Sequence, residues 1–273
     1  MDRTAKEEYM CLKSKLKTDC EKCSGLCCVA LYCAKTDGFP EDKDAGNPCI
    51  NLMPDFRCAI HSQLSQKNMR GCLAYDCFGA GQAVTQSFSP DANWSKKPKQ
   101  ADEIFQTFLA VFQLNQMLWY LIEALSAVSD KQLESQIEML ILENEQRTSQ
   151  PSGKLLSPDI EVYRLKVNEI LKKVIKIISV SPSSGGKNKD FFGKDFKKAN
   201  LEHRDFSMSL IIAANLKECR LRGAILLGAD MRDAIIEDTD LSECLFLTQM
   251  QINSAKGNSN TKIPAGLSRP SSW

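Results

Sequence analysis

Large apolar residues recur at every fifth position through the last third of this 273-residue chain. Twelve follow one another in register: Phe191, Phe196, Leu201, Phe206, Ile211, Leu216, Leu221, Leu226, Met231, Ile236, Leu241 and Phe246. A period of five belongs to neither an α-helix nor a β-strand. A short period sustained this long is typical of stacked coils, in which each repeat contacts its neighbours. The pattern therefore favours a binding or shielding surface over a catalytic pocket.

The position two residues before each large apolar residue is also restricted. From Ser209 onward it holds only small residues: Ser209, Ala214, Cys219, Ala224, Ala229, Ala234, Thr239 and Cys244. The intervening residue is often Asp or Asn, as in Ala199-Asn200-Leu201. We expect both restricted positions to point into a narrow core and the remaining positions to face water. For Cys219 and Cys244 we expect packing in that core rather than a redox or ligand role.

These units resemble the pentapeptide-repeat family, whose unit is Ala-Asp/Asn-Leu followed by two variable residues. The resemblance implies a right-handed quadrilateral β-helix with four units to a turn, so that the units make about three turns. The first units carry Lys189, Lys194 and Arg204 in the small position, which predicts an irregular first turn or a partial cap. The tail, with Pro264 and Trp273, is expected to cover the open end of the solenoid.

Ten of the twelve cysteines lie between Cys11 and Cys77. The N-terminus stays polar and has no secretory hydrophobic region, so we expect a cytoplasmic protein with reduced thiols. Clustered cysteines in a reducing compartment indicate metal ligation. A C-x2-C pair places two thiolates on one turn, and the adjacent Cys27 and Cys28 are expected to point in different directions and to serve two sites.

The run Cys20-x2-Cys23-x3-Cys27-Cys28 resembles the zinc- or iron-chelating cluster family with the signature CxxCxxxCC. The last spacing, C-x4-C, departs from the C-x3-C of that family, and His61 stands where the family tends to carry an aromatic residue. His61 is a ligand or an ordinary surface or core histidine, while Cys11 and Cys33 lie outside the match. The resemblance implies a ligand set of eight: Cys20, Cys23, Cys27, Cys28, Cys49, Cys58, Cys72 and Cys77.

Zinc is the metal expected at these cysteines, because it favours tetrahedral all-thiolate ligation. Iron, or an iron–sulfur cluster held by four cysteines, is the alternative. We expect the metal to staple a loop-rich domain rather than to act in redox or catalysis, because metal-binding energy is then folding energy.

Apolar residues at helical spacing predict three helices in the middle of the chain. The first covers about 101–128, and the second opens with Ser129 and Gln132 at the spacing of a capping box. The third has Ser157 as its N-cap and Pro158 as its first residue. The apolar faces are expected to form a helical hairpin or bundle core rather than a groove for a partner.

Charge and missing motifs exclude several classes of function. Lys and Arg total 35 against 34 Asp and Glu, and this near-neutral balance argues against direct nucleic-acid binding. The most apolar stretch, 104–128, is interrupted by Gln113, Asn115 and Glu123, so no membrane span is expected. The chain has only two histidines and lacks nucleotide-binding and HExxH motifs. Enzymatic chemistry outside the cysteine module is therefore not expected.

Together these features predict a multidomain α+β protein. Its segments are 1–80, a cysteine-rich metal-binding module; 81–100, a loop; 101–180, a helical domain; 181–188, a linker; 189–250, the pentapeptide-repeat β-helix; and 251–273, a C-terminal cap or tail.

The favoured function is that of a non-enzymatic metal-binding protein whose solenoid is a protein-interaction surface. Its protein partner is unspecified, and a homodimer is left open. The first alternative is an antibiotic or toxin resistance protein, because some pentapeptide-repeat relatives shield DNA gyrase by imitating duplex DNA. Such imitation needs a long acidic rod, whereas residues 187–250 contain 10 Lys/Arg and 11 Asp/Glu. The second alternative is an iron–sulfur or zinc redox enzyme or sensor.

Overall fold

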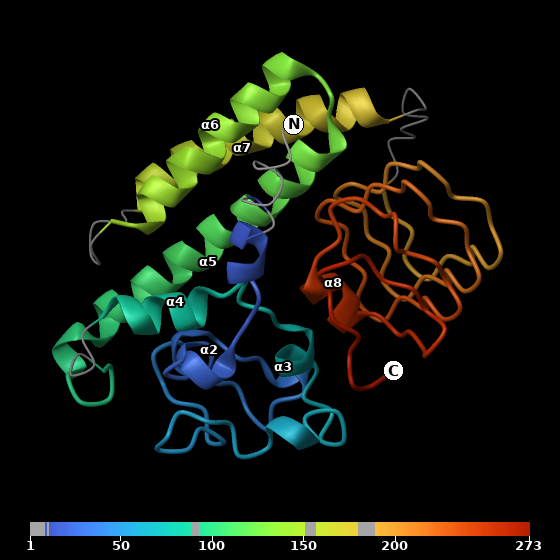
Figure 1. Cartoon of the computed structure of the whole chain (residues 1–273). Coiled ribbons are helices and arrows are strands. Elements are labelled where there is room, and N and C mark those ends of the chain that lie inside the picture. The colour runs from blue at the N-terminus through green and yellow to red at the C-terminus, as the bar shows by residue number, and fades with distance from the viewer. Residues whose placement is uncertain (1–8, 10, 89–92, 151–156, 180–188) are drawn as a thin grey trace. The chain divides into compact units, whose positions relative to one another are not determined.

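A computed structural model describes residues 9, 11–88, 93–150, 157–179 and 189–273 (Figure 1). The predicted linker over 181–188 lies outside these residues. Contacts divide the chain into two compact units, the first with the N-terminal cysteines and the second with the repeat. The first unit consists of Met1–Cys72, Asp76–Ile122 and Glu134–Ile170, and the second of Leu73–Tyr75, Glu123–Leu133 and Leu171–Trp273.

The cysteine-rich part of the first unit consists of short helices joined by loops. Isolated antiparallel bridges between Cys33 and Lys43 and between Leu52 and Cys58 tie these loops together. The short helices are η1 (Cys20–Lys22), α2 (Leu26–Ala30), η2 (Lys35–Asp37), η3 (His61–Gln63), α3 (Arg70–Ala74) and α4 (Ala80–Ser87).

Helix α4 corrects the prediction of a loop over 81–100. The helix starts directly after Gly79, whose φ of 73° lies in the left-handed region that favours glycine. Ala80 and Val84, four residues apart, are buried on one face of the helix. The turn formers around this segment predict a loop, but the helical spacing of these buried side chains outweighs them.

Three long helices make up the helical middle of the chain, as predicted (Figure 1). They are α5 (Pro98–Ala127), α6 (Lys131–Thr148) and α7 (Ser157–Ile178). Buried Asn144 on α6 donates hydrogen bonds to the carbonyl of Leu114 on α5 at 3.0 Å and to the hydroxyl of Tyr163 on α7 at 3.1 Å. These bonds join the three helices, because buried polar groups must find partners inside the protein.

The N-terminal cap of α6 differs from the prediction. Asp130, and not the predicted Ser129 and Gln132, caps α6, since its carboxylate accepts the N–H of Leu133 at 2.8 Å. Helix α5 is long and apolar enough to cross a membrane, but 67% of its most apolar window is buried inside the protein. Such burial is typical of a core helix.

The cysteine-rich part is anchored on α5 through Phe78. The amide of Asn115 donates to the carbonyl of Phe78 at 2.7 Å. The Phe78 ring, which is fully buried, lies 6.0 Å from the ring of Phe112 and 6.1 Å from that of Trp119. The segment that carries Cys77 is therefore held against a rigid helix.

The repeat forms stacked coils joined by parallel bridges (Figure 1). Eight of the ten parallel bridges link a residue to the one four five-residue units later, as Asp190 to Leu210 and Leu210 to Asp230, and the other two join Ile235 to Lys256 and Asp240 to Lys262 in the tail. The bridges are isolated ones, and no longer strand runs through the described residues of the repeat. The inward positions are confirmed: Ile211 and Ala214, a large and a small one, are both fully buried.

Asp or Asn precedes seven of the twelve large apolar residues and has a backbone role that the sequence does not reveal. The side-chain oxygen of each accepts the N–H of the residue two positions later and so closes the local turn of the backbone. The pairs are Asp190 with Phe192, Asp195 with Lys197, Asn200 with Glu202, Asp205 with Ser207, Asn215 with Lys217, Asp230 with Arg232 and Asp240 with Ser242.

The two ends of the repeat are closed by different side chains. In the first coil, the guanidinium of Arg204 lies over the rings of Phe191, Phe196 and Phe206, at 5.4, 5.8 and 5.2 Å from their centroids. A cation–π cluster thus replaces the small inward residue of later units. At the other end, Trp273 packs against the core of the repeat, as expected for a covering tail.

Candidate metal centre

Nine cysteines of the first unit form the candidate metal centre. All twelve cysteines of the chain are free thiols. Of the nine, Cys20 is exposed, Cys77 is buried and the others are half-buried. Cys11 is exposed, whereas Cys33, which lies outside the predicted set, is half-buried among the nine. The nine are Cys20, Cys23, Cys27, Cys28, Cys33, Cys49, Cys58, Cys72 and Cys77.

Gly81, in the first turn of α4, lies under two of the sulfurs. A Cβ at this position would lie 2.7 Å from Sγ of Cys23 and 3.6 Å from Sγ of Cys77. The first distance is shorter than Cβ atoms show in real structures, so a side chain at position 81 would displace the sulfur of Cys23. The segment before α2 and the segment before α4 therefore bring their cysteines together over one helix turn.

Backbone N–H groups point at these two sulfurs. The N–H groups of Gly25 and Leu26 donate to Cys23, and those of Gly79 and Gly81 donate to Cys77. The Thr18 hydroxyl also lies 3.3 Å from Sγ of Cys77. Burial raises the pKa of both thiols, and these hydrogen bonds oppose that rise by favouring the thiolates. Hydrogen bonds to sulfur of this kind tune thiolate ligands in metal centres.

The remaining cysteines are held by contacts between loops. The N–H of Cys49 donates to the carbonyl of Cys28 at 2.9 Å. Cys33 is paired with Lys43, and Cys58 with Leu52, through the antiparallel bridges. Cys72 lies in α3.

Lys43 supplies a fixed positive charge beside these loops. Its ammonium donates to the backbone carbonyls of Leu31 and Asn47, the latter at 2.9 Å. The hydrogen bond from Cys27, together with the charge of Lys43, lowers the pKa of Cys28. Lys43 is half-buried, and its positive charge offsets part of the negative charge of neighbouring thiolates.

Desolvation, followed by repulsion between thiolates, raises the pKa of two further cysteines. Cys20 is exposed at the surface, but the surrounding protein partly desolvates its thiol, and this raises the pKa of Cys20 to about 11, with further contributions from the thiolates of Cys77 and Cys23. Burial also raises the pKa of Cys72 to about 12, with contributions from the thiolates of Cys28 and Cys33. A bound cation would relieve this repulsion, because metal ligation requires the deprotonated form.

The sequence predicts that Cys27 and Cys28 point in different directions. In the structure their side chains point toward each other. Their sulfurs lie 3.9 Å apart in hydrogen-bonding contact. That contact, followed by burial, raises the pKa of Cys27 well above its ordinary value, whereas the pKa of Cys28 is lowered. The distance is close to the edge of about 3.8 Å expected for a zinc tetrahedron with Zn–S bonds of about 2.3 Å.

The described residues hold no group of three or more Cys, His, Asp or Glu side chains already arranged to bind a metal ion. The donor chemistry nevertheless fits a soft ion, since the groups brought together are thiols. The approach of Cys23 and Cys77 over Gly81, and the N–H groups directed at their sulfurs, are also compatible with a thiolate-bound ion. His61 begins η3 and is exposed.

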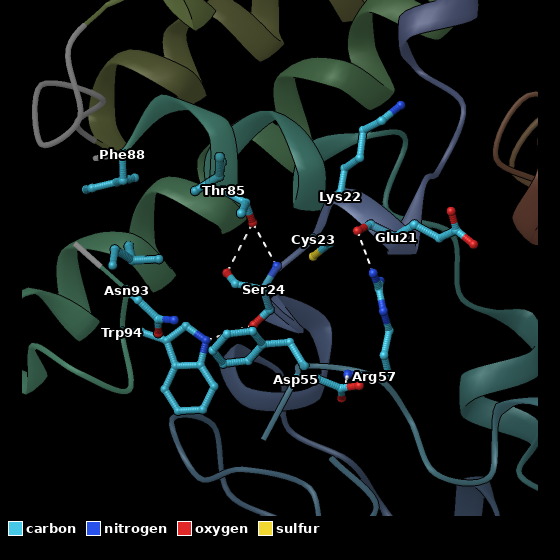
Figure 2. Close-up of a pocket in the computed structure, with 13 residues that line it drawn as sticks. Glu21, Lys22, Cys23, Ser24, Asp55, Arg57, Thr85, Phe88, Asn93 and Trp94 are labelled. Carbon is cyan, nitrogen blue, oxygen red and sulfur yellow. Dashed lines mark hydrogen bonds between the residues drawn. The ribbon is translucent and has the colours of Figure 1, made fainter. Parts of the chain in front are cut away.

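A cavity of about 300 Å³ reaches Cys23 from the surface (Figure 2). Its inner wall is held by Thr85, whose hydroxyl accepts the N–H of Ser24 at 2.9 Å and contacts the hydroxyl of Ser24. Trp94 closes another side and donates from Nε1 to the carbonyl of Ser24 at 2.8 Å. Arg57 lines the rim and donates to the carbonyl of Glu21 at 2.7 Å. The cavity gives a metal ion or a thiol reagent a path to Cys23.

Comparison with known proteins supports the reading of the repeat. The sequence model of the family described as pentapeptide repeats (8 copies) matches residues 212–246. The uncharacterized protein YybG of Bacillus subtilis (strain 168) is 39% identical over 264 residues, which cover 94% of this chain and 95% of that protein. No solved structure matches the chain significantly.

Proposed function

Since this chain is a pentapeptide-repeat protein of the same family as YybG, we propose that it is a non-enzymatic metal-binding protein. In this proposal the cysteine module holds the metal, and the solenoid is a surface for a protein partner. The protein acts in the cytoplasm, where thiols stay reduced and available to a metal.

The arrangement of the free cysteines carries the metal-binding half of the proposal. Residues far apart in sequence, such as Cys23 and Cys77, meet over Gly81 with N–H groups directed at their sulfurs. The N–H groups favour the thiolate form of these two cysteines, which is the form that binds a metal.

Zinc is the proposed metal, held by thiolates from the eight predicted cysteines. Bound zinc would act as a structural staple without redox chemistry of its own, and its binding energy would add to the folding energy of the module. The module needs such a contribution, because its short helices are joined by long loops. Iron or an iron–sulfur cluster is the alternative occupant.

The outer surface of the solenoid supports a protein partner rather than imitation of DNA. The parallel bridges show that the coils of the repeat are stacked. We propose that these coils form a right-handed quadrilateral β-helix. Acidic residues on its outside are paired with cations, as in Lys217 with Glu237 at 2.8 Å and Arg222 with Glu243 at 2.7 Å. Such pairing interrupts any continuous acidic face, which a mimic of duplex DNA would need.

Elemental analysis and an optical spectrum of the protein purified without oxygen test the metal half. Colourless protein with bound zinc is the expected result. Brown protein that absorbs visible light would show that the cysteine module holds an iron–sulfur cluster and not zinc. Protein free of any metal would contradict the proposal.

A further inference from the structure

We propose that the first coil of the repeat, residues 189–208, binds an acidic and extended peptide segment of a partner protein as a further strand. The segment lies along the outer edge of this coil, which is the edge turned away from the second coil. This inference rests on the proposed function, because it gives the partner surface of the solenoid a position and a chemistry.

The backbone at this outer edge lacks the partners that the second coil has. In the second coil, the N–H of Arg220 donates to the carbonyl of Ala199 in the first coil at 3.1 Å. The equivalent N–H one coil earlier belongs to Asn200, and its neighbours along the edge are those of Asp195 and Asp205. Among the described residues none of these three N–H groups has an acceptor. An exposed row of unpaired backbone groups is a template for pairing with another chain.

At the C-terminal end, the tail of the chain takes the place of a further coil. Lys256 and Lys262 of the tail form parallel bridges with Ile235 and Asp240 of the repeat. At the N-terminal end, Arg204 covers the aromatic rings but leaves the backbone edge unpaired. The part of the chain that the structure describes contains no segment that pairs with this edge as the tail pairs with the other. The N-terminal end is therefore the one that can accept a strand.

Two cations lie over the apolar interior of the first coil and favour an acidic partner. The ammonium of Lys194 is 5.5 Å from the centre of the Phe191 ring, and the guanidinium of Arg204 is 5.4 Å from the same point. Both cationic residues are exposed, and neither forms an ion pair with a described acidic residue. A carboxylate of the partner can therefore bind them without displacing a native ion pair.

The acidic side chains of the same coil are bound by the coil itself. The carboxylate of Asp195 accepts the N–H of Lys197 at 3.0 Å, and that of Asp205 accepts the N–H of Ser207 at 2.8 Å. The ammonium of Lys189 also lies 4.0 Å from the carboxylate of Asp205. These interactions reduce the repulsion that the two carboxylates exert on an acidic partner.

An extended peptide fits this end better than a second copy of the same end. Two copies placed end to end would bring Lys194 and Arg204 of one molecule against those of the other, and facing like charges oppose association. In strand addition, backbone hydrogen bonds supply affinity and side-chain contacts supply specificity. Here the N–H groups of the edge would donate to peptide carbonyls, while the two cations would bind peptide carboxylates.

Amide hydrogen exchange of the full-length protein tests the position. The probe is a short synthetic peptide of alternating valine and glutamate, which is extended and acidic. In the free protein we expect fast exchange at Asp195, Asn200 and Asp205 and slow exchange at Arg220, whose N–H is bonded. Saturation with the peptide should slow exchange at the first three.

Three outcomes would overturn the inference. Slow exchange of the three amides in the free protein would show that the edge is already paired, and fast exchange at peptide saturation would show that no strand is added there. Slowed exchange on another part of the repeat would move the site and leave the solenoid as the partner surface. Metal content of the same sample tests the metal-binding half of the proposed function separately.

Lys194→Glu and Lys197→Glu are a matched pair of variants, because they make the same change of charge in one exposed coil. Affinity for the labelled peptide is measured by fluorescence anisotropy. Lys194→Glu should weaken binding by about fivefold or more, because repulsion replaces attraction. Lys197→Glu should change it little, since only Lys194 lies over the Phe191 ring. Equal affinities for the two variants would remove Lys194 from the site.

Two further peptides test the backbone pairing. They carry N-methyl groups at alternate residues, one peptide on each of its two edges. The peptide whose methyl groups face the first coil should bind about tenfold or more weakly than the parent, because it loses several backbone hydrogen bonds. The other should bind like the parent. Equal binding of both to that of the parent would overturn strand addition.

Discussion

Gly81 and Cys23 are in such close contact that a methyl group at position 81 would lie 2.7 Å from the sulfur. The two residues are far apart in sequence, and the contact exists only because α4 presents its first turn to the loop that carries Cys23. The same turn receives Cys77. The relationship explains a glycine inside a helix, where glycine otherwise lowers stability.

Gly81→Ala is expected to lower the affinity for zinc by about tenfold or more, since the added methyl group displaces a ligand sulfur. The measurement is competition for zinc against a chromophoric chelator. Helix propensity works in the opposite direction, because alanine favours a helix over glycine by about 1 kcal/mol. A variant with unchanged zinc affinity would contradict the assignment of Cys23 and Cys77 as ligands.

Gly223→Ala is expected to lower the free energy of unfolding by about 2 kcal/mol. The added Cβ would collide with Nδ1 of His203 on the neighbouring coil. Urea unfolding followed by circular dichroism measures the effect.

Gly193→Ala is the matched control for that variant. Gly193 has the same left-handed backbone, with φ of 61° against 67° for Gly223, but its added Cβ would meet nothing within 4 Å. Its cost should be about 1 kcal/mol, from the backbone alone. Equal costs for the two variants would show that the ring of His203 does not hold its place over Gly223. Adding His203→Ala to Gly223→Ala should recover the difference.

Leu216→Asp or Leu226→Asp is expected to unfold the repeat, because each side chain is only 1% exposed and a carboxylate would enter a dry core. Met208→Asp is the matched control, since Met208 is 70% exposed. Circular dichroism and thermal unfolding distinguish the variants. A spectrum and a melting temperature like those of the native protein, for either leucine variant, would refute the register of the repeat.

The stability of the repeat is expected to decrease in acid partly through Asp240. Hydrogen bonds from Ser242, followed by those from Lys262, lower the pKa of Asp240 to about 2. A carboxyl group with a lowered folded-state pKa stabilises the protein above its unfolded pKa, near 3.9. That stabilisation is lost as pH falls through about 4 to about 2.

Asp240→Asn tests this contribution, because the amide oxygen still accepts the N–H of Ser242 but cannot ionise. Unfolding free energies of the two proteins, measured from pH 6 to acid, should converge as the pH falls. A constant difference across the range would show that the charge of Asp240 contributes nothing.

Strict periodicity made the repeat predictable from sequence. Each inward position is set by local spacing, so the burial of Leu216 and Ala214 follows without knowledge of the rest of the fold. The role of Asp and Asn in closing the turns was not predictable in this way, because composition shows the preference but not the bonded N–H. Arg204 occupies a position that holds a small residue in later units. Only the structure shows that its guanidinium lies over three phenylalanine rings.

The cysteine module was less predictable, because spacing along the chain does not determine which loops meet. The signature around Cys20 and Cys23 identifies thiols of one turn. It cannot show that Cys77 meets Cys23 over Gly81. Those neighbours are fixed by long-range backbone pairing and by the packing of α4.

X-ray absorption spectroscopy at the metal edge of the purified protein tests metal binding by thiolates most directly. We predict a zinc edge with a shell of sulfur alone, at about 2.3 Å and with about four sulfurs per ion. A shell of nitrogen and oxygen, or protein without any metal, would contradict the assignment of the cysteine module as a metal centre.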